Sequence, residues 1–361
     1  MRTALYDNWA ALKEKLSAAA TEQEIPLFGT FELTPFCNLA CQMCYMRLSP
    51  EQARAIAAPL SCEDWLRLGA AAQKNGTLFL LLSGGEAMLR PDFPEIYEGL
   101  SRMGFLIKLY TNATLLTPTL KALFRRIPPA SVGISIYGAS AETYARVTGH
   151  ASAYEKAMHG LDFFISLGIP VQIRTTLSKL NVSDFDALCA LAADKGADFV
   201  YCSVLTASVR GAKSQAAEVR LSPEEMLALR VHINRDLSPE MLRHIAEDKD
   251  ASCSDTPFAC AAGKNAYVIT WDGKMRPCLL FDTPFAEPLT TDFSAAWQKI
   301  KTDIKTLSEP EACRGCEKSP YCSACLGAIL AENGRLDTPS AYHCAWGACH
   351  YDAMHPKEDN G

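Results

Sequence analysis

Between residues 27 and 206 the sequence alternates between short apolar segments and longer amphipathic ones. The apolar segments have the length and composition of strands buried on both faces, and the amphipathic segments carry apolar residues at helical spacing. The expected strands are residues 28–34, 78–83, 106–111, 132–137, 171–177 and 199–205, and the expected helices lie near residues 62–74, 93–103, 117–125, 154–167 and 184–195. This strand-then-helix order predicts an α/β fold whose parallel sheet is covered by helices.

Three cysteines, Cys37, Cys41 and Cys44, lie on a loop directly after the first expected strand. Thiolates at this spacing can converge on one metal centre. A structural zinc site or a closed iron–sulfur cluster takes four protein ligands, so three thiolates would leave one position of a cluster open. In barrels of parallel strands the active site lies at the carboxyl ends of the strands, where this loop is found. The alternative is a zinc knuckle or chance clustering, since 15 of 361 residues are cysteine.

The composition narrows the class of protein. A content of 48% hydrophobic and 21% charged residues is that of a globular protein, and a net charge of −6 without a basic run argues against a nucleic-acid partner. No apolar run is as long as a membrane span, and residues 1–20 lack the apolar core of a signal peptide. We therefore expect a cytoplasmic protein without a membrane partner, in which reduced thiols bind metal instead of forming disulfides.

The cysteine loop resembles the Cys-x3-Cys-x2-Cys motif of the radical S-adenosylmethionine (SAM) enzymes. The resemblance implies a partial (β/α)6 TIM barrel and a [4Fe–4S] cluster whose open iron binds SAM. In the family, an electron from this cluster cleaves SAM to a 5′-deoxyadenosyl radical, which abstracts hydrogen from the substrate. The residue before the third cysteine is usually aromatic, whereas here it is Met43, and Tyr45 is expected to supply the adenine contact instead.

Polar residues at the strand ends extend the resemblance. Ser83-Gly84-Gly85-Glu86 follows the second expected strand and resembles the family's Gly-Gly-Glu motif, in which the glycines admit a ligand and Glu86 would accept a hydrogen bond from the SAM ammonium group. By the same resemblance Ser135 would bind the ribose and Arg174 the SAM carboxylate. Ordinary turn chemistry is the alternative for such residues. The expected SAM contacts are Tyr45, Gly84, Gly85, Glu86, Asn112, Ser135 and Arg174.

The alternation stops after residue 206, and cysteines dominate the last third of the chain. Their pattern resembles the SPASM extension of peptide-modifying radical SAM enzymes: a cysteine, a Gly-x4-Cys hairpin (Gly273 and Cys278), a compact cysteine run and a late cysteine. The Cys322-x2-Cys325 spacing is one residue shorter than usual in the family. A zinc ribbon is the alternative, but a ribbon would use only four of these thiols.

Two closed [4Fe–4S] clusters and one open cluster require eleven thiolates. The SPASM resemblance implies interleaved ligands, so that the first auxiliary cluster would be bound by Cys253, Cys260, Cys278 and Cys325, and the second by Cys313, Cys316, Cys322 and Cys344. Cys349 could replace Cys344. The remaining thiols, those of Cys62, Cys189 and Cys202, are expected to be small core residues.

These patterns divide the chain into five expected regions. They are an N-terminal helix (1–24), the radical SAM barrel (25–210), a linker and helical segment (211–252), the auxiliary-cluster domain (253–350) and a flexible tail (351–361).

The resemblance implies a radical SAM enzyme that modifies a peptide or protein, forming a thioether, a carbon–carbon crosslink or an oxidised side chain. Its expected cofactors are SAM and three [4Fe–4S] clusters, and its electron donor would be a flavodoxin or ferredoxin. Only 36 residues precede Cys37, too few for a leader-binding domain, so a separate leader-peptide-binding protein or direct recognition is expected.

Two alternatives remain. A sulfatase-maturating, formylglycine-forming enzyme would have similar clusters, but it carries an acidic residue next to a cluster ligand, whereas Cys278 is followed by Leu279-Leu280-Phe281. A non-catalytic electron carrier or zinc scaffold would have no use for the Gly-Gly-Glu motif and an open three-cysteine loop.

Overall fold

The computed structural model describes residues 2–234 and 260–355. Within them, strands β1 to β8 form one sheet in the order β6-β5-β4-β3-β2-β1-β7-β8. Neighbouring strands run parallel from β6 across to β7, and β8 is antiparallel to β7. The expected partial (β/α)6 barrel is therefore confirmed. Its strands are β1 (Phe28–Glu32), β2 (Phe79–Ser83), β3 (Leu106–Thr111), β4 (Ser131–Ser135), β5 (Val171–Thr176) and β6 (Asp198–Cys202).

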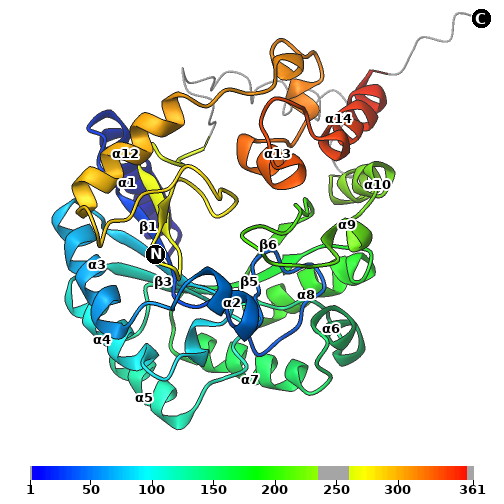
Figure 1. Ribbon diagram of the computed structural model, residues 1–361. Coiled ribbons are helices and arrows are strands. Elements are labelled where there is room, and N and C mark those ends of the chain that lie inside the picture. The colour runs from blue at the N-terminus through cyan, green and yellow to red at the C-terminus, as the bar shows by residue number, and fades with distance from the viewer. Residues whose placement is uncertain (1, 235–259, 356–361) are drawn as a thin grey trace, which may run out of the picture.

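Helices cover the outer face of the curved sheet (Figure 1). Those that follow the strands are α3 (Cys62–Lys74), α4 (Phe93–Arg102), α5 (Pro118–Arg126), α6 (Ala141–Thr148), α7 (Ala153–Ser166) and α8 (Phe185–Lys195). Several begin where a side chain caps the free backbone N–H groups: Ser61 forms a capping box with Asp64, and Thr117 accepts from the N–H of Leu120 ahead of a proline at the first helical position. The sequence did not predict α6 or the short α2 (Pro50–Ile56).

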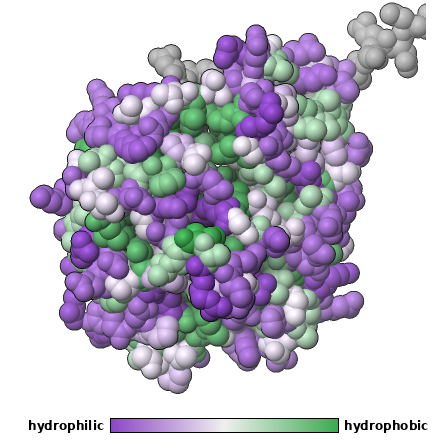
Figure 2. Space-filling model, in the orientation of Figure 1, coloured by the Kyte–Doolittle hydropathy of each residue, from purple (hydrophilic) through white to green (hydrophobic). Residues whose placement is uncertain are grey.

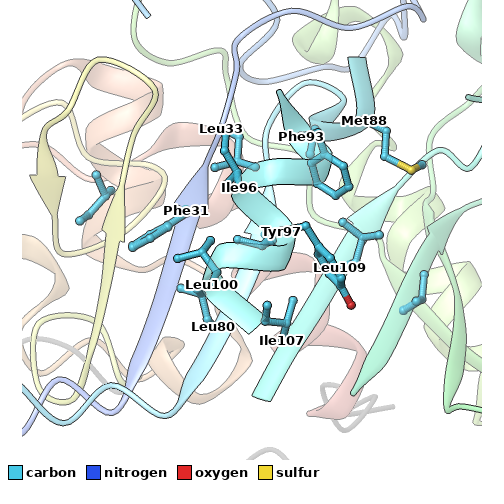
Figure 3. Close-up of a cluster of buried hydrophobic side chains, with 14 of the residues drawn as sticks. Phe31, Leu33, Leu80, Met88, Phe93, Ile96, Tyr97, Leu100, Ile107 and Leu109 are labelled. Carbon is cyan, nitrogen blue, oxygen red and sulfur yellow. The ribbon is translucent and has the colours of Figure 1, made fainter. Parts of the chain in front are cut away.

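The main core lies between the sheet and these helices. Figure 3 shows Phe93, Ile96, Tyr97 and Leu100 of α4 packed beside Leu80 of β2 and Ile107 and Leu109 of β3. Burial alternates along β3 and β5, so every second residue faces the helices and the others face the inside of the barrel. The inner face carries Lys108, Tyr110 and Arg174, which makes it more polar than strands buried on both faces would be.

The C-terminal region extends the sheet and also covers one end of the barrel. Strand β7 (Ala266–Ile269) pairs with β1 and turns back into β8 (Met275–Arg276). The helices that follow are α12 (Phe293–Lys305), α13 (Leu326–Asn333) and α14 (Ala341–Met354), and α14 packs against α10 (Pro223–Ile233), which precedes the hairpin. The sequence did not predict that a strand from the cysteine-rich C-terminal region, β7, would join the barrel sheet.

The N-terminal helix α1 (Arg2–Glu22) lies within the region 1–24 where a helix was expected, and it is attached to the C-terminal region. Asn265, just before β7, is almost fully buried, and its side-chain amide donates to the backbone oxygen of Ser17 at 2.9 Å and to the hydroxyl of Thr21 at 2.8 Å. The indole of Trp297 in α12 donates to the carbonyl of Glu24 at 2.7 Å. The first and last thirds of the chain are thereby joined.

None of the helices in the described ranges has both the length and the hydropathy needed to cross a membrane. The face of the molecule shown in Figure 2 is mostly hydrophilic, with hydrophobic residues in separate patches.

A substitution in the main core tests this packing. Phe124 of α5 is fully buried and contacts the rings of Phe93, Tyr97 and Phe164. Because Phe124→Ala removes these contacts and leaves a cavity, we expect it to lower the free energy of unfolding by about 3–5 kcal/mol. Urea denaturation followed by circular dichroism measures the loss, and Val231→Ala, at an exposed site of α10, is the control. A loss of less than about 1 kcal/mol in Phe124→Ala would contradict the assigned core.

Candidate functional site

A cavity of about 390 Å³ lies at the carboxyl ends of the parallel strands. The structure brings together there nearly all residues that the sequence singled out in the barrel: Cys37, Cys41, Cys44, Tyr45, Gly84, Gly85, Asn112, Ser135 and Arg174. They come from the loops or ends of β1 to β5. Glu86, the remaining residue of the set, does not line the cavity. The assignment of individual contacts to SAM stays a prediction.

The cysteine loop is held in place by backbone hydrogen bonds to the end of α6. The N–H of Ala40 donates to the carbonyl of Thr148 at 2.9 Å, and that of Gln42 donates to the carbonyl of Val147 at 3.1 Å. The sulfur of Cys37 accepts a hydrogen bond from the backbone N–H of Leu39 at 3.4 Å. All of these contacts are made within the protein, so the loop backbone is held in place by the protein itself.

The pKa values of two thiols in the loop are raised. Burial, with smaller contributions from Glu86 and Cys44, raises the pKa of Cys37 to about 12, while the N–H of Leu39 opposes the shift. Burial likewise raises the pKa of Cys41 well above its ordinary value, with contributions from Cys44 and Cys37. Metal cations bind the thiolate form of cysteine and displace the thiol proton, so an iron cluster would offset the raised pKa values of Cys37 and Cys41. The donor set therefore fits a cluster bound by three thiolates.

Gly84 and Gly85 allow the end of β2 to lie against the chain that leads into Cys37. A Cβ on Gly85 would lie 2.2 Å from the carbonyl oxygen of Phe36, and one on Gly84 would lie 2.7 Å from that of Thr34. Gly84 also has φ = +147°, which disfavours any other residue. The N–H of Gly85 donates to the carbonyl of Thr34 at 2.7 Å. In this structure, then, the glycines permit close contact between two backbone segments as well as lining the cavity.

The carboxylate of Glu86 is buried and fully engaged within the protein. One oxygen accepts from the backbone N–H of Met88 at 3.1 Å, and the other accepts from the N–H of Asn112 at 2.8 Å. The hydroxyl of Thr111 reaches both oxygens at 2.9 and 3.0 Å. Burial raises the pKa of Glu86 to about 7, and the hydrogen bonds from Asn112, Met88 and Thr111 oppose this shift. Glu86 thus joins the end of β2 to the end of β3.

Arg174 is the cation best placed for an anionic ligand. Its guanidinium lies 4.3 Å from the centre of the Tyr110 ring, and its Nη1 donates to Gln172 Oε1 at 3.4 Å. The salt bridges found in the described residues do not include Arg174, although its side chain lines the cavity. A cation without a carboxylate partner suits the expected contact with the SAM carboxylate.

Sequence reasoning missed several residues that line the same cavity, among them Tyr110, Tyr137, Tyr201, Cys202 and Leu279. The expectation that Cys202 is a core residue is wrong, because its side chain is exposed and lies at the end of β6. The alternation of side chains along a strand carries the signal for some of them. Tyr110 lies two residues after Lys108, so both side chains lie on the inner face of β3. Leu279 comes from the C-terminal region and could not be placed without the fold.

The C-terminal thiols fall into two groups in the described part of the chain. Burial raises the pKa of Cys278 to about 11, with smaller contributions from the nearby thiols of Cys325 and Cys260. In the second group, burial raises the pKa values of Cys313, Cys322 and Cys344, with smaller contributions from one another's thiols and from Cys316. Burial also raises the pKa of Cys349, where the smaller contributions come from Glu224 and Asp352. Cys253, a predicted ligand, lies outside the described residues.

The grouping agrees with the interleaved pattern and leaves the ligand assignment a prediction. Within residues 2–234 and 260–355, no three His, Cys, Asp or Glu side chains converge closely enough to hold a single metal ion.

Comparisons with known proteins give the context of this site. The family model described as the radical SAM superfamily matches residues 31–192. A probable GTP 3′,8-cyclase of Aeropyrum pernix is 30% identical over 301 residues, which cover 78% of this chain and 82% of that protein. An AdoMet-dependent heme synthase of Methanosarcina barkeri is 25% identical over 86% of this chain and 93% of its own. The sporulation killing factor maturation protein SkfB of Bacillus subtilis is 25% identical over 81% of this chain and 73% of its own.

Two solved structures share the fold. AnSMEcpe with bound AdoMet and a Cp18Cys peptide has a TM-score of 0.67 at 14% identity, covering 92% of this chain and 98% of that one. SuiB of Streptococcus suis bound to S-adenosylmethionine has a TM-score of 0.65 at 14% identity, covering 92% of this chain and 79% of that one.

The two interpretations of Glu86 predict different outcomes for Glu86→Gln. Each carboxylate oxygen accepts from a backbone N–H, so an amide nitrogen in either position leaves the N–H of Met88 or Asn112 without an acceptor. We therefore expect Glu86→Gln to lower the free energy of unfolding by about 1–3 kcal/mol. Chemical denaturation measures this loss, with Glu95→Gln on the exposed side of α4 as the control. Unchanged stability together with SAM affinity weakened by about 1.5–3 kcal/mol would show instead that the carboxylate serves the ligand.

Proposed function

Because this chain belongs to the radical SAM superfamily, we propose that Cys37, Cys41 and Cys44 bind one [4Fe–4S] cluster, and that SAM binds at the iron they leave open. The cluster and SAM together would supply the one-electron chemistry that removes hydrogen from an unactivated carbon. The observation that carries this proposal is the convergence of three thiols and the Gly84–Gly85 segment on one cavity at the carboxyl ends of the strands.

The chain's own residues would bind and orient SAM. Arg174 would pair with its carboxylate, since the guanidinium lines the cavity and has no carboxylate partner among the described residues. Asn112 is held by Asn38, whose side-chain oxygen accepts from its amide at 2.9 Å, and the same amide lies 3.8 Å from the sulfur of Cys37. Asn112 would thus keep the cysteine loop and the end of β3 at a fixed separation. Tyr45 and Ser135 remain our candidates for the adenine and ribose contacts.

We propose a peptide or protein as the substrate. A PqqA peptide cyclase of Rhizobium meliloti is a relative at 26% identity whose name describes a peptide substrate, and SkfB, AlbA and MftC, at 24–26% identity, are named for the maturation of a killing factor, the biosynthesis of a bacteriocin and the maturation of mycofactocin. The cavity extends past the cysteine loop to the exposed Tyr201 and Cys202, leaving surface for a chain to approach. The modification would be a thioether, a carbon–carbon crosslink or an oxidised side chain.

We propose further that the C-terminal thiols bind two auxiliary [4Fe–4S] clusters, as in SPASM domains. Cys260, Cys278 and Cys325, with Cys253, would hold the first, and Cys313, Cys316, Cys322 and Cys344 the second. Leu279 lines the cavity one residue after Cys278, so the first cluster would lie beside the substrate. That position suits the removal of a second electron from the substrate. A flavodoxin or ferredoxin would supply electrons, a separate protein could present a leader peptide, and the cytoplasm would keep the thiols reduced.

A second candidate follows from the relatives. The heme synthase and the GTP cyclase are named for small-molecule reactions and match this chain over most of its length. A small-molecule substrate is therefore the principal competitor of the peptide. Sulfatase maturation, the alternative raised by the cysteine pattern, is a further candidate within the peptide class, and anSMEcpe, which shares this fold, is bound to a peptide in its structure.

The barrel cysteines provide the test of the radical SAM proposal. We expect the anaerobically reconstituted protein to release 5′-deoxyadenosine from SAM in the presence of dithionite, and we expect Cys37→Ala/Cys41→Ala/Cys44→Ala to release none, because the open cluster has no other ligands. Iron content should fall by about one cluster of three. Cys62→Ala, in α3, is the control. Normal 5′-deoxyadenosine release by the triple variant would exclude the proposal.

The substrate class is decided with the same preparation. Peptides encoded beside the gene, and separately a heme precursor, are incubated with protein, SAM and reductant, and the products are analysed by mass spectrometry. A mass change in a peptide supports the proposed function, and a change confined to the heme precursor overturns it.

The interleaved ligand pattern makes its own prediction. Cys325 lies within the run that otherwise serves the second auxiliary cluster, yet its thiol is close to Cys278. We therefore expect Cys325→Ala to remove the same cluster signal as Cys278→Ala and to leave the signal lost in Cys313→Ala, because cluster properties follow ligation. Mössbauer and EPR spectra of the three variants, each lacking the barrel cluster, measure this. If Cys325→Ala instead matches Cys313→Ala, the ligands are not interleaved.

A further inference from the structure

The segment after β6, residues 203–215, lies across the cysteine loop, and we refer to it as the strap. The backbone N–H of Val209 donates to the carbonyl of Tyr45 at 3.0 Å, and that of Gln215 donates to the carbonyl of Gln42 at 2.8 Å. Leu205 packs in a small buried cluster with Met43. The sequence alone suggested only a barrel end and a linker here, whereas the structure shows a segment bonded to the loop that carries Cys41 and Cys44.

The strap is anchored by a buried ion pair. The guanidinium of Arg210 binds both carboxylate oxygens of Glu32, the last residue of β1, with one N–O distance of 2.9 Å. The side chain of Arg210 is 8% exposed and that of Glu32 is 0% exposed. The hydroxyl of Tyr45 donates to the same carboxylate at 3.4 Å. One carboxylate thus joins the barrel, the cysteine loop and the strap.

The hairpin β7–β8 belongs to the same charged cluster. Burial lowers the pKa of Arg210, but Glu32, Tyr45 and Asp272 together raise it above its ordinary value. Asp272 lies in the hairpin turn with its side chain 5% exposed, 3.6 Å from the guanidinium of Arg276. Arg276 precedes Cys278 by two residues. The cluster therefore reaches from the cysteine loop of the barrel to the segment that carries Cys278, an expected ligand of the first auxiliary cluster.

Two features of Arg210 indicate that its position matters beyond stability. Buried ion pairs contribute little to folding stability, because desolvation offsets their attraction. Arg210 also has φ = +55°, a left-handed conformation that residues other than glycine seldom adopt. Such strain persists where surrounding contacts enforce it, and it is concentrated at functional sites. Four to six residues before Arg210, the strap contributes Val204, Leu205 and Thr206 to the wall of the cavity.

We propose that Arg210 is a positioning residue: through Glu32 it holds the strap against the cysteine loop, so that residues 204–206 form a fixed wall against which the substrate peptide is oriented. This inference rests on the proposed peptide reaction. The strap would orient the substrate relative to the barrel cysteines. A small displacement of the substrate from that position lowers the reaction rate strongly.

The test compares Arg210→Met with Arg126→Met. Arg126 is the control, because its guanidinium also binds both oxygens of one carboxylate, that of Glu98 in α4, at 2.9 and 2.7 Å, while both residues lie on helices outside the strap. In Arg210→Met we expect amide hydrogen exchange of residues 203–215 to accelerate about tenfold or more. We also expect the peptide KM to rise about tenfold, with a smaller change in kcat. Arg126→Met should leave both quantities near those of the unaltered protein.

A double variant separates positioning from stability. Arg210→Met leaves the Glu32 carboxylate buried without the cation that binds it, and adding Glu32→Gln removes the negative charge, so the melting temperature should recover. The exchange rate of the strap and the peptide KM should stay altered, because the anchor is still missing. Recovery of all three measurements would overturn the proposal in favour of a purely structural ion pair. Unchanged exchange of residues 203–215 in Arg210→Met would overturn it too, and this measurement needs no peptide turnover, so its outcome is independent of the proposed function.

Discussion

The arrangement of the site depends on the contact between the backbone after β2 and the backbone that leads into Cys37. Any side chain at Gly85 would overlap the carbonyl of Phe36, so only glycine lets these two segments share their hydrogen bonds. Glu86 then continues the connection to β3 through Thr111 and Asn112. Three strand ends are thereby fixed to one another, and the cysteine loop is placed over them, where the side chain of Asn38 adds hydrogen bonds to Asn112 and Thr114.

Much of this could be predicted from the sequence, because the information is local. Strand and helix order follows from apolar periodicity, and the ends of parallel strands meet at one edge of the sheet, so the residues at the ends of β1 to β5 were expected together. The role of the Glu86 side chain could not be predicted in this way. Its partners, Met88 and Asn112, offer backbone N–H groups, and a backbone donor leaves no signature in the sequence.

The parts that sequence reasoning missed depend on contacts distant in the chain. Cys202 has the apolar neighbours of a core strand residue, but β6 is the edge of the sheet, and its end is left open to the cavity. The strap has a small, polar composition that indicates a linker, yet one buried arginine and two backbone hydrogen bonds make it part of the site. Composition describes the average of a segment, whereas a single buried ion pair can decide where it lies.

Pairing of β7 with β1 has a consequence for how the chain folds as it is made. Register joins Phe28 to Ala266 and Phe31 to Ile269, so the first strand synthesised receives its second neighbour only after more than two hundred further residues. Until then one edge of β1 exposes unpaired backbone groups, the condition under which strands of different molecules associate. Such distant pairing is slow to form, because a long loop must close before the contact is gained. The cysteine loop therefore lies beside the last part of the sheet to be completed during synthesis.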